Sequence, residues 1–378
     1  MSPNEQTLSA NTISTTGNLQ RLYNFSAGPS TMPLSVLKKA QDELLNYQAN
    51  GMSIMEMSHR SKTFQSVLAD CKAGIKDILN VPDTHDILFL QGGASLQFTM
   101  VPMNLALPQR SVDVINTGSW TKKAIKALAD HSEYRIVATS EDSHFDRIPS
   151  VTVSDFSEEA AYAYLTSNNT IFGTQFQTFP DTGDVPLVAD MSSDIMSRPL
   201  SVSDFGLIFA GAQKNLGPSG VTLVIIDTLL AQRAQTSVPD MLLYRTHIEQ
   251  NSLYNTPPTF GIYLMGLMME WISSQGGLGT IEARNKEKAQ LIYDLVDDSD
   301  FYEGPVQIDS RSVMNVVFKL ADEALESAFL KGAEAKGLSG LKGHRSVGGM
   351  RASIYNAMPV EGVQALVAYM KEFRDTHA

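Results

Sequence analysis

A lysine between two apolar runs is the residue in this sequence best suited to nucleophilic chemistry. Lys214 lies between the strand-like runs 206–211 and 221–226, with a glycine-rich turn before the second run. We therefore predict that it lies at the junction of two buried strands. Burial removes water from an ammonium group, lowers its pKa and frees the neutral amine to attack a carbonyl. A solvated lysine on an ordinary hairpin turn is the alternative for this residue taken alone.

A glycine-rich turn upstream has the pattern of an anion-binding helix start. The run 86–91 reads as a buried strand, and Gly92-Gly-Ala-Ser95 then leads into a predicted helix. The free N–H groups and the positive end of such a helix attract anions such as phosphate. The turn matches neither the Walker A motif nor the dinucleotide fingerprint, which argues against a nucleotide site.

Two further residues lie at strand ends, where open α/β sheets place ligand contacts. Trp120 follows the strand-like run 112–116 and is suited to stacking on a flat ring or to covering the sheet edge. Asp190 ends another apolar run, where an aspartate is suited to cap a helix or to bind a metal; no cluster of His, Cys and carboxylate side chains surrounds it in the sequence, which argues against a metal. With Lys214 and the glycine turn, these residues meet the needs of pyridoxal phosphate: a phosphate cradle, a ring stack, a partner for the pyridine nitrogen and a lysine.

Composition and charge exclude several other classes of protein. The chain has 378 residues, which favours two domains, and its net charge of −12 disfavours bulk binding to nucleic acid or to an anionic membrane. The single cysteine, Cys71, rules out an intrachain disulfide framework and fits a reducing cytoplasm. No apolar run approaches the ~20 residues that span a bilayer. Residues 1–21 are polar and predict a disordered tail without the features of a signal peptide.

The order of the predicted elements indicates an α/β protein. Strand-like runs alternate with helical stretches through the first 230 or so residues, so a mainly parallel sheet should be covered by helices on both faces. The short connection after Lys214 predicts a hairpin and hence one antiparallel edge strand. We also predict a helix over 155–167. A long charged helix over 278–296 should lead into a second domain.

Several blocks of the sequence resemble the phosphoserine aminotransferase family of class V aminotransferases. They are Asn24–Ser30, Ser58–Arg60, Gly92–Ser95, Gly118–Trp120, Asp190–Ser193, Gly211–Asn215, Tyr254–Phe260 and Gly343–Ala357. The resemblance begins near residue 22 and continues to the C-terminus. It implies a fold-type-I, pyridoxal-phosphate-dependent transferase with a large domain (33–274) around a mainly parallel seven-stranded sheet and a smaller α/β domain (22–32 and 275–378). It also implies a cytoplasmic homodimer with active sites at the subunit interface.

The resemblance assigns roles to individual residues. The implied cofactor contacts are Ala94, Ser95, Trp120, Thr170, Asp190, Gln213 and Lys214, with Asn255 and Thr256 reaching in from the partner subunit. Lys214 would attach to the cofactor's aldehyde and shuttle a proton, Asp190 would keep the pyridine nitrogen protonated and Trp120 would stack on the ring. The implied substrate contacts are His59, Arg60, His344, Arg345 and Arg351. Arg351 would bind the α-carboxylate, and the other four would receive the substrate's phosphate or the side-chain carboxylate of glutamate.

One position departs from some members of the family. Ser95 stands where those relatives have an arginine, so backbone N–H groups and the helix end must contribute more to phosphate binding here.

The activity implied by the resemblance is a ping-pong transamination between glutamate/2-oxoglutarate and O-phosphoserine/3-phosphohydroxypyruvate in serine biosynthesis. It leaves open whether phosphorylated 4-hydroxythreonine of pyridoxine biosynthesis is a second substrate. Serine–pyruvate and alanine–glyoxylate aminotransferases are alternatives, although their substrates need fewer distal cations. A cysteine desulfurase needs a mobile loop cysteine, whereas Cys71 is predicted inside a helix. A non-catalytic α/β protein that holds an anionic ligand is the remaining alternative.

Overall fold

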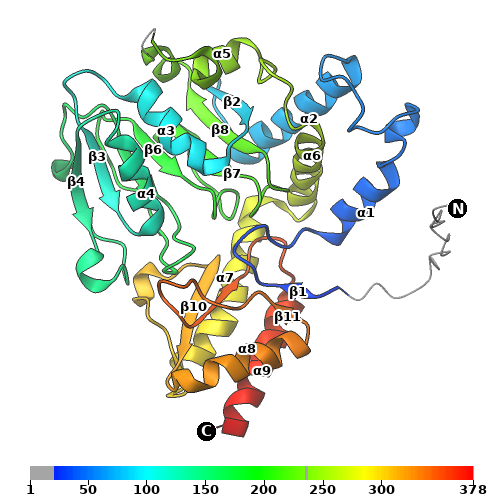
Figure 1. Cartoon of the computed structure of the whole chain (residues 1–378), viewed down its shortest axis with the longest axis vertical. Coiled ribbons are helices and arrows are strands. Elements are labelled where there is room, and N and C mark those ends of the chain that lie inside the picture. The colour runs from blue at the N-terminus through cyan, green and yellow to red at the C-terminus, as the bar shows by residue number, and fades with distance from the viewer. Residues whose placement is uncertain (1–20, 235–236, 378) are drawn as a thin grey trace, which may run out of the picture.

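A seven-stranded sheet forms the centre of the larger part of the molecule (Figure 1). The computed structural model describes residues 21–234 and 237–377, so the tail predicted for residues 1–21 lies outside the described residues except for Arg21. Along the sheet the strands are β2 (His85–Leu90), β8 (Thr222–Asp227), β7 (Leu207–Gly211), β6 (Leu187–Asp190), β5 (Ala163–Thr166), β3 (Val112–Asn116) and β4 (Tyr134–Thr139). The strands from β7 to β4 pair in parallel, which confirms the predicted fold class of a mainly parallel sheet.

Two predictions about this sheet are wrong. The helix predicted over 155–167 is a short 3₁₀ turn (Val153–Asp155) followed by β5, whose residues are all buried. A short apolar run that is buried on both faces of a sheet has no alternating pattern, so its sequence does not distinguish it from a buried helix. The predicted antiparallel strand exists as β8, but it lies one place inside the edge because β2 pairs beside it.

Helices cover both faces of the sheet. Helices α1 (Leu34–Glu43), α2 (Lys62–Leu79) and α6 (Thr259–Ser274) pack on one face, and α3 (Gly93–Leu105), α4 (Ser119–Leu128) and α5 (Tyr244–Glu249) pack on the other. Alternate strand residues point to opposite faces, as they must in a pleated strand: Ile208 packs with the first group and Phe209 with the second. Within the described part of the chain, no helix is both long and apolar enough to cross a membrane.

The smaller part of the molecule is an antiparallel sheet with helices against it. Helix α7 (Gly277–Asp297) leads into it from the larger part (Figure 1). The three-stranded sheet has the order β12 (Met350–Ser353), β10 (Asn315–Leu320) and β9 (Tyr302–Glu303), and it packs with α8 (Glu326–Ala335) and α9 (Val360–His377). Near the N-terminus, β1 (Tyr23–Asn24) pairs in parallel with β11 (Leu338–Ser339), which joins the first described residues to the smaller part.

Buried asparagines join the two parts next to Lys214, beginning with the adjacent residue Asn215. The side-chain oxygen of Asn215 accepts from the backbone N–H of Asn356 at 3.0 Å, and the Asn356 side chain donates to the carbonyl of Met196 at 2.8 Å. Asn285 of α7 donates to the side-chain oxygen of Asn356 at 2.8 Å. Because unsatisfied buried amides are costly, this network allows few relative positions of the two parts.

A buried lysine holds the same segment of the smaller part. The ammonium of Lys288, on α7, donates to the carbonyl oxygens of Ile354, Tyr355 and Met358 at 2.8, 2.7 and 3.2 Å. These carbonyls follow β12, the strand that carries Arg351. Lys288 and the asparagine network therefore fix where Arg351 lies relative to Lys214.

Candidate active site

Lys214 lies in the connection between β7 and β8, as the sequence predicts. The backbone of this connection is closed by a hydrogen bond from Ala212 N–H to the carbonyl of Val221 at 3.0 Å. Burial of the Lys214 amine lowers its pKa to about 8, the carboxylates of Asp190 and Asp194 oppose that shift, and the charge of Arg351 adds to it. A large share of the amine is therefore neutral near pH 8, the form that can act as a nucleophile or base.

The N-terminal segment covers the backbone of the lysine. The hydroxyl of Ser30 donates to the carbonyl of Lys214 at 2.6 Å, and the Ser30 N–H donates to the carbonyl of Gln213 at 3.0 Å. Gly28 has a φ of +136°, and a Cβ there would lie 3.4 Å from Cγ of Lys214. A side chain at Gly28 would therefore be strained and would crowd the lysine, which explains the glycine in the block Asn24–Ser30.

Two buried carboxylates lie near the lysine. Asp190, at the end of β6, accepts from the N–H of Ser192 at 2.9 Å; burial raises the pKa of Asp190, and the contacts with Ser192 and Lys214 partly offset this. Asp194 accepts from the side-chain amide of Gln175 at 3.1 Å and from the hydroxyl of Ser167, and burial raises its pKa as well. Sequence reasoning assigned a role to Asp190 but missed Asp194, although Asp194 lies only four positions beyond the end of β6.

The indole of Trp120 faces the lysine. Its ring N–H donates to the hydroxyl of Thr170 at 2.8 Å, and the ammonium nitrogen of Lys214 lies 6.0 Å from the ring centroid. Thr170 is itself buried, so the hydrogen bond fixes the orientation of the indole. The structure thus brings three of the predicted cofactor contacts to one place.

The glycine turn presents an open helix start. Helix α3 begins at Gly93, no side chain among the described residues caps it, and a Cβ on Gly92 would lie 2.6 Å from Cβ of Leu96. The N–H groups of its first turn, which includes Ala94 and Ser95, are therefore free of side-chain partners. The hydroxyl of Ser95 accepts from the ammonium of Lys123 at 2.9 Å, a contact that sequence reasoning did not anticipate.

Basic side chains of the smaller part lie on the same side of the molecule as Lys214, and the charge of Arg351 acts on its amine. Arg351 donates through Nη1 to the carbonyl of Thr170 at 2.9 Å, while its buried Nε has no hydrogen-bond partner among the described residues. Burial, together with the charges of Arg351 and Arg345, lowers the pKa of His344. An arginine with an unused, desolvated N–H is suited to bidentate binding of a carboxylate.

Four of the predicted site residues do not join this group within one chain. His59 and Arg60 lie in the loop before α2, and in the described ranges no hydrogen bond or ion pair links them to Lys214 or Arg351. Asn255 donates to the side chain of Gln91, next to the glycine turn, at 2.8 Å, and Thr256 is exposed. Gln213 adjoins Lys214, and its side chain folds over Gly211.

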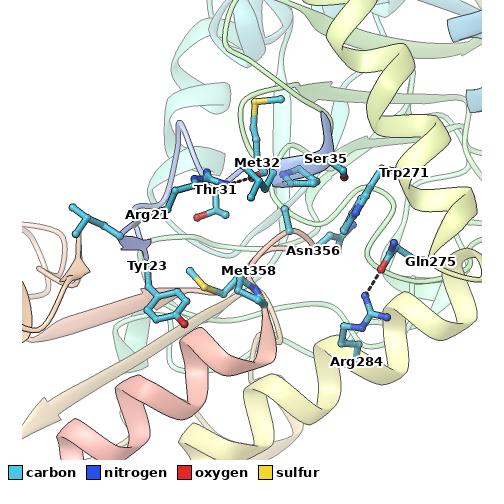
Figure 2. Close-up of a pocket in the computed structure, with 15 residues that line it drawn as sticks. Arg21, Tyr23, Thr31, Met32, Ser35, Trp271, Gln275, Arg284, Asn356 and Met358 are labelled. Atoms are coloured by element: carbon cyan, nitrogen blue, oxygen red, sulfur yellow. Dashed lines mark hydrogen bonds between the residues drawn. The ribbon is translucent and has the colours of Figure 1, made fainter. Parts of the chain in front are cut away.

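A separate cavity of about 410 Å³ lies beyond the asparagine network (Figure 2). It is lined by Arg21, Trp271, Arg284 and Asn356, among others, and Arg284 donates to Gln275 at 2.8 Å. None of the predicted cofactor or substrate contacts lines it. The chemistry suggested by the sequence therefore belongs to the Lys214 site.

The residues around Lys214 fit pyridoxal phosphate. A buried carboxylate, an amine of lowered pKa, an indole face and an uncapped helix start correspond to its ring nitrogen, aldehyde, ring and phosphate. Across residues 21–234 and 237–377, no three His, Cys, Asp or Glu side chains are grouped to hold a metal ion. The match to an organic phosphate cofactor rests on the carboxylate, the amine, the indole and the helix start themselves.

The chain is similar in sequence to proteins of one family. A model of the class V aminotransferases matches residues 22–366. The phosphoserine aminotransferases of Lysinibacillus sphaericus and Geobacillus kaustophilus are 52% and 54% identical, covering 95% and 94% of this chain and 99% of each relative.

Solved structures give the same result. The phosphoserine aminotransferase from Bacillus circulans subsp. alkalophilus superposes with a TM-score of 0.93 at 49% identity, covering 95% of this chain and 99% of that one. A phosphoserine aminotransferase with bound PLP from Trichomonas vaginalis superposes with a TM-score of 0.88 at 38% identity, covering 93% of this chain and 100% of that one. An alanine–glyoxylate aminotransferase from Nostoc shares only the fold, with 13% identity.

Replacing Asp194 by Asn tests the electrostatic origin of the Lys214 pKa. Because the carboxylate of Asp194 opposes the shift caused by burial, Asp194→Asn should lower the pKa of Lys214 below about 8. The measurement is the pH dependence of amine-reagent labelling of Lys214 in cofactor-free protein, followed by peptide mass spectrometry. Asp184→Asn, an exposed change of the same charge, is the control and should leave the midpoint unchanged. If the pH midpoint of Lys214 labelling is the same in both variants, Asp194 does not affect the pKa of Lys214.

Proposed function

The chain belongs to the phosphoserine aminotransferase family of class V aminotransferases, and on this premise we propose that it transfers an amino group from glutamate to 3-phosphohydroxypyruvate, giving 2-oxoglutarate and O-phosphoserine in serine biosynthesis. The observation that supports the proposal is that Arg351, held by the carbonyl of Thr170, lies near an amine of lowered pKa, with His344 close to Arg351 and Arg345. Amino-acid substrates with a second anionic group need both features in one site.

The proposed cofactor is pyridoxal 5′-phosphate. When bound, it carries the amino group between the two half-reactions and takes up the electron pair released at the substrate Cα. Asp190 would keep the ring nitrogen protonated, and Trp120 would cover one face of the ring. The first turn of α3, with Ala94 and Ser95, would hold the phosphate.

Lys214 is proposed to move the proton at the substrate Cα. The neutral amine takes up the proton, and the resulting ammonium returns a proton during the second half of each transfer. A pKa near 8 suits this task because both protonation states are then accessible near neutral pH. The carboxylates of Asp190 and Asp194 raise the pKa of Lys214 and burial lowers it, so that neither the charged nor the neutral amine is excluded.

The substrate contacts follow from the cation group. The unpaired Nε–H of Arg351 and an N–H of its Nη2 would bind the α-carboxylate that all these substrates share. His344 and Arg345 would receive the phosphate of O-phosphoserine or the side-chain carboxylate of glutamate. One cationic pocket can serve both substrates in turn because their distal groups are both anions.

We further propose a homodimer in which a second copy completes each site. Leu45, Met52 and Met55 are 84%, 41% and 56% exposed, and they precede His59 and Arg60 in the chain. Apolar side chains exposed this close together are typical of a surface covered by a partner. A partner seated there would bring these two side chains, and its Asn255 and Thr256, to the neighbouring site.

We also propose that the protein is located in the cytoplasm. The single buried Cys71 fits this reducing compartment.

The desulfurase alternative fails on the position of the cysteine. Cys71 lies inside α2, is fully buried, and burial raises the pKa of its thiol. A buried thiol of raised pKa supplies little thiolate and cannot reach a substrate. The extended similarity to phosphoserine aminotransferases favours the main proposal over the other class V activities.

The substrate assignment predicts discrimination between phosphoserine and serine. With 2-oxoglutarate as acceptor, kcat/KM for phosphoserine should exceed that for serine by roughly 10- to 150-fold, since losing a charge-assisted contact costs about 1.5–3 kcal/mol. Arg345→Gln should lower the ratio of the two kcat/KM values, whereas Lys342→Gln, an exposed change in the same loop, should leave this ratio unchanged. Comparable kcat/KM values for both substrates would refute the proposed specificity.

The proposed dimer predicts complementation between two inactive chains. Co-expressed in equal amounts, Lys214→Ala and Arg60→Ala chains should form heterodimers with one intact site and recover about a quarter of wild-type activity. Pairing Lys214→Ala with Arg351→Ala is the control, because both residues come from one chain and no intact site forms. If the co-expressed pair is no more active than the two variants measured separately and added together, Arg60 does not act across an interface.

A further inference from the structure

We infer that Lys123 supplies the cation that balances the cofactor's phosphate, in concert with Ser95. The inference rests on the proposed function and deepens it, because it identifies how this chain binds the phosphate without an arginine in the glycine turn. Lys123 lies on α4, outside the turn, and no sequence pattern connects it with Ser95.

The geometry places the ammonium of Lys123 at the open start of α3. Its nitrogen lies 2.9 Å from the hydroxyl oxygen of Ser95. It also lies 5.9 Å from the ring centroid of Trp120 and 5.9 Å from that of Phe98. The charge is therefore located between the uncapped helix start and the indole that would cover the cofactor ring.

The neighbouring lysine shows how Lys123 differs. Lys122 forms an ion pair with Glu141 at 2.5 Å and lies 5.1 Å from the ring centroid of Phe145, so its charge is already balanced. For Lys123, no carboxylate lies within ion-pair distance in the part of the chain that the structure describes. Of these adjacent lysines, only Lys123 has its charge free for an external anion.

The chemistry of the pair suits a phosphate monoester. An ammonium has three N–H donors and the Ser95 oxygen uses one, which leaves two for phosphate oxygens. The Ser95 hydroxyl accepts from Lys123 and keeps its own proton to donate to the same anion. Together with the N–H groups of the first turn, the pair can surround a dianion with donors from two helices.

A charge argument explains why a cation is needed. The start of a helix acts as only about half a positive charge, whereas a phosphate monoester carries close to two negative charges at pH 7. Ser95 is neutral and the turn Gly92–Ser95 contains no basic side chain. Lys123 supplies a full charge from the adjacent helix and so compensates for the serine at this position.

The test measures the affinity of cofactor-free protein for the cofactor, with quenching of tryptophan fluorescence as the signal of binding. Lys123→Met should weaken binding of pyridoxal 5′-phosphate about tenfold or more, as expected for loss of a charge-assisted contact, and should leave binding of phosphate-free pyridoxal unchanged. Lys123→Arg should restore most of the affinity. Lys122→Met is the matched control and should change neither affinity by more than about twofold, since its charge is already paired. Thermal unfolding of the cofactor-free variants checks that each one folds.

The outcomes separate this inference from the proposed function. If the wild-type chain binds the cofactor tightly and Lys123→Met binds it equally well, the assignment of Lys123 is overturned while the proposed function stands. Equal losses for pyridoxal phosphate and pyridoxal would also overturn it, because the lysine would then not act on the phosphate. If the wild-type chain fails to bind pyridoxal phosphate, both proposals fail.

Discussion

The site depends on keeping one lysine amine partly neutral inside a folded protein. Desolvation alone would drive the pKa of Lys214 far down, and full exposure would leave it near its ordinary value of about 10.4. Two buried carboxylates, Asp190 and Asp194, oppose the desolvation, and the cation of Arg351 acts with it. The balance gives a pKa of about 8, which lies close enough to neutrality for the same group to accept and return a proton.

The rest of the fold fixes the groups that set this balance. The parallel strands bring Asp190 and the connection that carries Lys214 to the same edge of the sheet, because β6 and β7 are neighbours. Arg351 comes from the smaller part, and its position depends on the buried contacts of Asn215, Asn356 and Lys288. Burial lowers the pKa of Lys288 to about 7, yet its nitrogen is occupied by three carbonyl oxygens. A buried lysine of lowered pKa is therefore not sufficient for reactivity; the amine must also be free and accessible.

The sequence predicts those parts of the site that depend on local patterns. Lys214, Asp190 and Trp120 each follow an apolar strand, and the end of a strand in such a sheet is a place for ligand contacts, so their positions follow from short stretches of sequence. The contact between Ser95 and Lys123 joins two helices across 28 positions, and no local pattern encodes it. Strand β5 was mistaken for a helix because burial on both faces removes the alternation that identifies a strand. The roles proposed for His59 and Arg60 depend on the proposed second subunit, and no pattern within one chain reports such a contact.

The identity of the lysine that binds the cofactor tests the central claim most directly. The protein is incubated with pyridoxal 5′-phosphate, reduced with borohydride, digested and analysed by tandem mass spectrometry to locate the pyridoxyl group. We predict that the label lies on Lys214 and is absent from Lys288, a fully buried lysine that also has a lowered pKa, because carbonyl oxygens occupy the Lys288 amine. A label on Lys288, a label spread over surface lysines, or no label at all would contradict the account.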